Sequence, residues 1–180
     1  MAEYVALLRG IAPSNPKMHN TELRRVFDEL GFDAVRTVIA SGNVCFRSPE
    51  RSRARLENAI EVALADHLGA PCCTIVRSRS QLERLLRSDV FDGHEDAPAS
   101  RLNVTFLKRR AQQSEPVPTP GEGARIVAVR DQAVFSVVDS TRSKTPDLMN
   151  VLERAYGKDV TTRTWKTVGR IAAALAALDA

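Results

Sequence analysis

The sequence has few cysteines, few aromatic residues and no long apolar run. Its three cysteines, Cys45, Cys72 and Cys73, are odd in number and two are adjacent, which argues against a disulfide framework and a paired-cysteine metal site. The longest apolar run, 171–178, is too short to cross a bilayer, so no membrane association is predicted. No basic leader precedes the first apolar segment, and we therefore expect a cytoplasmic protein without a secretory signal.

The sequence also contains no recognisable set of catalytic residues. The three histidines, His19, His67 and His94, are too far apart in the chain to suggest a metal site. Ser143 and Lys144 are adjacent and would point apart in an extended segment, so they make a poor nucleophile–base pair. No metal, cofactor or catalytic residue is predicted, and whether the protein is an enzyme stays open.

The charge balance is mildly basic, with a formal net charge of +4 and a pI near 9.2. A basic balance can indicate nucleic-acid binding. Here, however, 21 arginines stand against 5 lysines and are spread over the whole chain. Together with the abundant alanine, this distribution is more typical of GC-rich codon usage than of selected phosphate contacts.

The first half has the pattern strand, helix, strand, strand, helix, strand. Apolar residues at 4–8 and 73–76 and around the turn 41–43 predict the strands, and periodic apolar stripes at 23–30 and 56–68 predict the helices. Right-handed crossovers then place the strands in the order 4-1-3-2, with both helices on one face. This is the ferredoxin-like plan, or α-β plait.

That strand order brings two distant segments together. The end of the first strand lies beside the start of the third, so the segment 9–17 meets the turn 41–43. Cations, glycines and amides in one place are suited to an anionic ligand, although Arg9 could equally bond loop carbonyls. The residues predicted to bind a ligand here are Arg9, Gly10, Asn15, Lys17, Ser41 and Asn43.

The second half is again mixed helix and strand. Ser80 and Glu83 form a predicted capping box that opens a helix. The segment 108–123 carries three prolines and two glycines and is predicted to be a loop. From these patterns we predict an α+β protein, divided near Ser78 into 1–78 and 79–180, whose first part is ferredoxin-like with an antiparallel sheet.

A second candidate site lies at the start of the last predicted helix. Its first turn is expected to hold Arg163 and Lys166 and no acid, and each exposed cation there opposes the helix dipole by about 0.3–1 kcal/mol. An anionic ligand held by Thr162, Arg163 and Lys166 would resolve the conflict. In the alternative interpretation, Arg163 pairs with an acid such as Asp139 or Asp159 and has a structural role.

RNA-recognition modules share the strand and helix order of the first half, but they stack bases on two or three exposed aromatic residues. Here the first strand offers Tyr4 and the third offers Phe46. Nucleic-acid binding through this sheet is therefore not predicted. Trp165 has helical spacing with Val168 and is expected in the core.

Four segments resemble one bacterial family, the domain of unknown function 1697. They are LLRGI at 7–11, ELGF at 29–32, VRTVIASGNVCF at 35–46 and TTRTWKT at 161–167. The resemblance implies an α+β fold of two tandem ferredoxin-like (α-β plait) subdomains with antiparallel sheets, and no known activity. The chain departs from the family pattern at 12–15, where the family usually has Asn-Val-Gly-Gly, and at Thr164, where it usually has Asn.

From these features we predict a binding protein for a phosphorylated or otherwise anionic small molecule, such as a nucleotide. Two alternatives stay open: an enzyme that acts on such a ligand, and a protein or nucleic-acid interaction module without a small ligand. The sequence does not indicate an oligomeric state.

Overall fold

The computed structural model describes residues 1–40, 42–111, 117–130, 132–142 and 148–178. The chain folds as two compact units, of which unit 1 consists of Met1–Leu86 and Gly169–Ala180 and unit 2 of Arg87–Val168. The predicted boundary near Ser78 falls at the end of a strand inside unit 1, and as a domain boundary it remains a prediction.

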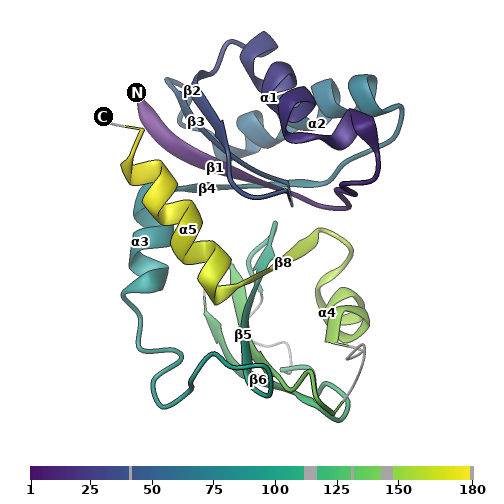
Figure 1. The fold of residues 1–180 in the computed structure, drawn as a ribbon, viewed down its shortest axis with the longest axis vertical. Coiled ribbons are helices and arrows are strands. Elements are labelled where there is room, and N and C mark those ends of the chain that lie inside the picture. Colours follow the sequence, from purple (N-terminus) through teal and green to yellow (C-terminus); the bar gives the residue numbers. More distant parts are fainter. Residues whose placement is uncertain (41, 112–116, 131, 143–147, 179–180) are drawn as a thin grey trace. The chain divides into compact units, whose positions relative to one another are not determined.

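Unit 1 contains one four-stranded antiparallel sheet in the order β2-β3-β1-β4. The predicted order 4-1-3-2 is thereby confirmed. The helices α1 and α2 cover the same face of this sheet (Figure 1). The elements are β1 (Ala2–Leu8), a short 3-10 helix (Pro16–Met18), α1 (Asn20–Glu29), β2 (Asp33–Thr37), β3 (Asn43–Ser48), α2 (Arg53–Leu68), β4 (Thr74–Ser78) and α3 (Arg79–Leu86).

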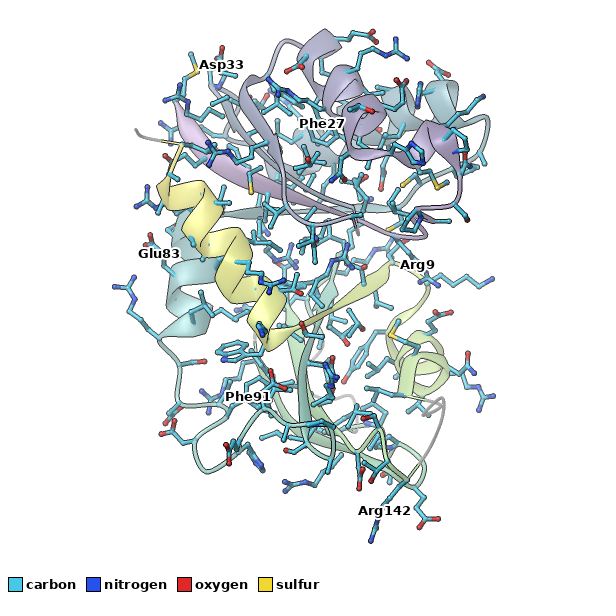
Figure 2. The ribbon with its side chains drawn as sticks, in the orientation of Figure 1. Arg9, Phe27, Asp33, Glu83, Phe91 and Arg142 are labelled. Atoms are coloured by element: carbon cyan, nitrogen blue, oxygen red, sulfur yellow. The ribbon has the colours of Figure 1, made fainter. Side chains whose placement is uncertain are left out.

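The core of unit 1 lies between its sheet and the two helices. Phe46 on β3 stacks on Phe32 with 4.4 Å between the ring centroids, and Phe27 on α1 meets Phe46 edge-on at 5.5 Å. Figure 2 labels Phe27 on α1. Leu56, Ile60 and Leu64 from α2 are at most 2% exposed in the same cluster. The apolar periodicity of the sequence therefore predicted which helix faces are buried.

The outer edge of β4 is closed by side chains rather than by another strand. Glu61 Oε1 accepts a hydrogen bond from Thr74 N at 2.8 Å, and Glu57 Oε1 accepts one from Val76 N at 2.9 Å. Two carboxylates one helical turn apart on α2 thus satisfy alternate N–H groups of the edge strand. An edge whose donors are occupied is a poor template for pairing with another chain.

Unit 2 repeats the strand arrangement in the order β6-β7-β5-β8. Its elements are β5 (Arg101–Leu107), β6 (Ala124–Arg130), β7 (Ala133–Val138), α4 (Leu148–Tyr156), β8 (Val160–Thr164) and the start of α5 (Trp165–Ala176), which ends in unit 1. In the described part of 108–123, the chain between β5 and β6 has no helix. The protein is thus α+β with two similar ferredoxin-like subdomains, as predicted.

The two faces of the unit 2 sheet differ in chemistry. The face toward α4 carries the buried apolar residues Leu107, Val134 and Val160, but also hydroxyls. Thr105 Oγ1 lies 2.7 Å from Thr162 Oγ1 on the neighbouring strand. On the opposite face, Phe135 belongs to a cluster of edge-to-face rings with Phe91 and Trp165.

Candidate functional site

The end of β1 lies beside the β2–β3 turn, as the strand order predicted. Leu8 N donates to Gly42 O at 2.8 Å, and Arg9 N donates to Cys73 O at 2.9 Å. Leu7 pairs with Asn43 in the β1–β3 ladder. The convergence of the segment after β1 with the turn before β3 is therefore confirmed. Figure 2 labels Arg9 at this end of the sheet.

Gly42 allows the two segments to pack closely. It has φ +72°, and a Cβ at this position would lie 2.5 Å from Ile11 Cγ1 and 3.0 Å from Leu8 Cβ. A side chain here would need both an unfavourable backbone conformation and movement of its neighbours. The glycine therefore serves packing between the chain's own segments.

The polar side chains of this predicted site serve mainly the local structure. Asn43 is 1% exposed, and its Nδ2 donates to Val38 O at 3.0 Å inside the hairpin. Asn15 Oδ1 accepts from Lys17 N at 3.1 Å and begins the 3-10 helix. Gly10 and Lys17 are exposed and Arg9 is half-buried, whereas Ser41 lies outside the described residues. A ligand role for this set remains a prediction.

At the second predicted site, the helix begins later than expected. Arg163 lies in β8, which pairs with β5 as far as Thr164, so the prediction that Arg163 occupies the first helical turn is wrong. Thr164 Oγ1 accepts from Thr167 N at 3.2 Å and caps α5, whose first turn holds Lys166. β8 extends to Thr164 because each of its residues pairs with a residue of β5.

Within β8, successive side chains point to opposite faces of the sheet, so Thr162 and Arg163 do not share a site. Thr162 Oγ1 donates to Met149 Sδ at 2.8 Å on the α4 side. Arg163 Nη1 donates to Thr161 Oγ1 at 2.7 Å and to Thr162 O at 2.9 Å. Burial lowers the pKa of Arg163 to about 10, so the guanidinium stays charged at neutral pH.

Of the acids named as alternative partners of Arg163, Asp139 has other partners. Asp139 Oδ1 accepts from Thr141 N at 2.9 Å, and its Oδ2 lies 3.5 Å from Arg142 Nε. The hydrogen bond from Thr141 lowers the pKa of the Asp139 carboxyl. The backbone carbonyl of Asp159 accepts from Lys108 N at 3.0 Å. A ligand role for Thr162, Arg163 and Lys166 remains a prediction.

A pocket that the sequence did not indicate lies at the other end of the unit 1 sheet. It forms where β1 begins and β4 ends, since Tyr4 pairs with Ser78. Its volume is about 620 Å³, within the range of roughly 300–1,000 Å³ that is usual for small-molecule sites. The lining residues are Ala2, Glu3, Tyr4, Arg51, Arg53, Ser78, Arg79, Ser80, Gln81 and Glu83.

Arginines and glutamates face each other in this pocket. Arg79 Nη1 lies 3.0 Å from Glu3 Oε2, and Arg79 Nε lies 2.7 Å from Glu83 Oε1. Figure 2 labels Glu83 on α3. Arg51 is exposed, and within the described part of the chain its side chain makes no hydrogen bond or ion pair. The lining thus contains three arginines and two glutamates.

Two helices begin at the pocket. Ser52 Oγ accepts from Arg55 N at 3.4 Å and caps α2, so Arg53 is the first residue of that helix. The α3 cap uses Ser78 and Gln81, because Gln81 N donates to Ser78 Oγ at 3.3 Å and Ser78 N donates to Gln81 Oε1 at 3.0 Å.

The predicted capping pair, Ser80 and Glu83, is therefore wrong. The sequence contains two overlapping capping boxes, and the structure uses the first. Glu83 binds Arg79 instead.

A signal for this pocket was present in the sequence. Neither α2 nor α3 has an acid in its first turn, and arginines stand at 51, 53 and 79 where these helices start. The same combination, cations without an acid at a helix start, was the basis for predicting the second site at Arg163 and Lys166. The predicted strand order already implies that β3 and β4 both end beside the start of β1, but it does not show that the side chains there leave a pocket.

Other kinds of site find little support among the described residues. No group of three or more His, Cys, Asp or Glu side chains there could hold a metal ion. Burial raises the pKa of the Cys72 thiol to about 11, so this thiol is not a reactive nucleophile at neutral pH. Ser143 and Lys144 lie outside the described residues. None of the helices in the described ranges is both long and apolar enough to span a membrane.

Comparison with known proteins agrees with this architecture. The profile of the family described as a protein of unknown function, DUF1697, matches residues 1–135. The chain belongs to this family.

The fold is similar to that of a solved structure, a conserved bacterial protein, SP0830, from Streptococcus pneumoniae. The TM-score is 0.75 at 22% sequence identity, over 98% of this chain and 99% of that chain. No curated protein gives a significant match.

Proposed function

We propose that the protein binds a small molecule with a phosphate or carboxylate group in the unit 1 pocket, at the starts of α2 and α3. The observation that carries this proposal is the meeting of three arginines with two helix N-termini in one pocket of about 620 Å³. Each helix start carries the positive end of a dipole, which favours an anion, and at α2 the chain already places one there, since Glu50 Oε1 accepts from Ser52 N at 2.7 Å. Arginine supplies charged, bidentate hydrogen bonds to phosphate and carboxylate.

The arginines of the pocket have different roles in this proposal. Arg79 is held between Glu3 and Glu83 and ties the start of β1 to α3. Arg51 is exposed at the pocket, and Arg53 is half-buried at the first position of α2. Arg51 and Arg53 therefore supply the charge for the ligand, while Arg79 forms part of the wall.

A thermal-shift experiment tests the proposal. The probes are inorganic phosphate, sulfate, sugar phosphates, nucleotides and dicarboxylates, each up to about 10 mM. At a hundredfold excess over Kd, a bound ligand stabilises the folded state by about 2.7 kcal/mol. For a chain of this size that corresponds to a rise in Tm of roughly 5–10 °C.

The double variant Arg51→Ala/Arg53→Ala is expected to lose this shift. Arg24→Ala is the matched control, because Arg24 is an exposed arginine on α1, paired with Asp28 and outside the pocket. A panel without any stabilising probe, or an equal shift in the double variant, would contradict the proposal.

A further inference from the structure

We infer that the ligand of this pocket is a phosphorylated sugar rather than a nucleotide, with its phosphate at Arg51 and Arg53 and its hydroxyls at Glu3 and Glu83. This inference rests on the proposed binding function and specifies its ligand class. It depends on two features of the described lining: it contains both arginines and glutamates, and its aromatic residue, Tyr4, is buried.

The carboxylates of the pocket favour a ligand that carries hydrogen-bond donors as well as an anionic group. Glu3 comes from β1 and Glu83 from α3, and Arg79 lies between them at 3.0 Å and 2.7 Å. Two carboxylates repel a ligand that is only an anion. A carboxylate has about four acceptor positions, so one that binds Arg79 can also accept a bond from a hydroxyl.

Hydroxyl donors fit this end of the pocket better than an ammonium group. Arg79 already balances much of the negative charge of the two carboxylates, so a second cation would gain little and would be repelled by Arg79. The neighbouring groups are neutral hydroxyls: Ser78 Oγ and Ser80 Oγ lie 3.0 Å apart. Hydroxyls that both donate and accept match the hydrogen-bonding groups of a sugar.

The described lining offers no ring face for a nucleobase. Among the described residues that line the pocket, Tyr4 is the aromatic one. It is 4% exposed, and its hydroxyl donates to Glu50 O at 3.0 Å. A base that stacks on an accessible aromatic ring gains affinity from that contact. Since Tyr4 is buried and held, a nucleotide gains no such contribution over its sugar phosphate.

Titration calorimetry with the full chain separates these classes. The probes are inorganic phosphate, glucose 6-phosphate, ribose 5-phosphate, adenosine 5′-monophosphate and phosphoethanolamine. We expect at least one sugar phosphate to bind about tenfold or more tightly than inorganic phosphate. Adenosine monophosphate is expected to bind no more tightly than ribose 5-phosphate, and phosphoethanolamine no more tightly than inorganic phosphate.

The variant Glu83→Gln tests the hydroxyl end. It keeps the side-chain shape but removes one charge, and it should weaken sugar phosphate binding about fivefold or more while inorganic phosphate binds equally well or more tightly. Glu29→Gln is the control, because Glu29 is an exposed carboxylate paired with Arg25 on α1. Its affinities should match those of the wild type. The Tm of each unliganded variant shows whether the fold is intact.

The outcomes distinguish failure of this inference from failure of the proposed function. Equal binding of sugar phosphates and inorganic phosphate would leave the anion site intact and overturn the sugar assignment. Tighter binding of adenosine monophosphate than of ribose 5-phosphate, or of phosphoethanolamine than of the sugar phosphates, would also overturn it. No binding by any probe would overturn both proposals.

Discussion

Unit 1 and unit 2 end their first strands with the same two hydrogen bonds. In unit 1, Leu8 N donates to Gly42 O, and in unit 2 Leu107 N donates to Gln132 O at 2.9 Å. The next residues, Arg9 and Lys108, donate their N–H groups to the segments that precede β4 and β8. The strand frame thus repeats although the side chains differ, because strand pairing is made by the backbone.

The two units differ in what their sheets pack against. In unit 1, α1 and α2 cover one face, and the core on that face contains the buried rings of Tyr4, Phe27 and Phe46 as well as the buried hydroxyl residues Ser48 and Thr74. In unit 2, the corresponding face is covered by α4 and contains Thr105, Ser136 and Thr162. Ser136 is fully buried, and its Oγ has no hydrogen-bond partner among the described residues. One backbone frame can therefore carry a core rich in aromatic rings in unit 1 and, in unit 2, a core with a buried hydroxyl that has no described partner.

The largest expected effect tests the apolar core of unit 1. Phe46→Ala should lower the free energy of unfolding by about 3–5 kcal/mol, because it removes the ring contacts with Phe27, Phe32 and Tyr4. Leu152→Ala, in the core of unit 2, should lower it by about 2–4 kcal/mol. Urea unfolding followed by far-UV circular dichroism measures both.

The fluorescence of Trp165, the chain's single tryptophan, adds a probe that belongs to unit 2. For Phe46→Ala, the fluorescence midpoint should move less than the circular dichroism midpoint. Equal shifts of the two midpoints would mean that the two units unfold together, which would contradict the view that each unit has a core of its own.

An intermediate effect is expected at Gly42, where the two units have the same backbone hydrogen bond but different residues. Unit 2 has Gln132 at the position of Gly42. Gly42→Ala should destabilise the protein by about 2–4 kcal/mol, from the positive φ and from the overlap with Ile11. Gly10→Ala is the matched control, since Gly10 has φ +74° and no described atom lies within 4 Å of the added Cβ.

Gly10→Ala should therefore cost only about 1 kcal/mol, and the difference between the two midpoints in urea isolates the packing contribution. Equal losses for the two variants would show that the segment after β1 is not packed tightly on the turn.

The smallest effect concerns the polar face of unit 2. Ser136→Ala should change the free energy of unfolding by less than about 1 kcal/mol, or raise it, because it removes a buried hydroxyl that has no partner in the described part of the chain. Thr105→Val has the opposite expectation, a loss of about 1–2 kcal/mol, because it removes the bond to Thr162. A large loss in Ser136→Ala would show that the hydroxyl has a partner in solution.

Much of unit 1 was predictable because its signals are local or topological. Apolar periodicity marked the buried faces of α1 and α2, and the right-handed crossover rule led to the strand order. The close approach of the end of β1 to Gly42 and Asn43 followed from that order. The same reasoning misplaced the start of α5, since strand pairing with β5 overrides the helical pattern at Arg163.

The candidate pocket was harder to predict from the sequence. Arginines at the starts of α2 and α3 were visible, but nothing local relates Arg51 to Arg79. The choice between two overlapping capping boxes was equally undetermined, because both satisfy the same spacing rule. That choice decides whether Glu83 caps a helix or faces the pocket with Arg79.

The amino-acid pattern by itself determined most of the elements, the strand order of the unit 1 sheet and the meeting of the chain after residue 8 with the β2–β3 turn. These depend on periodicity and handedness, which act over short stretches of chain. Only the tertiary structure decided that a pocket remains where β3 and β4 end beside the start of β1, and that Arg79 lies there between Glu3 and Glu83. The physical reason is that the space left between loops depends on how their side chains pack, which strand order does not fix.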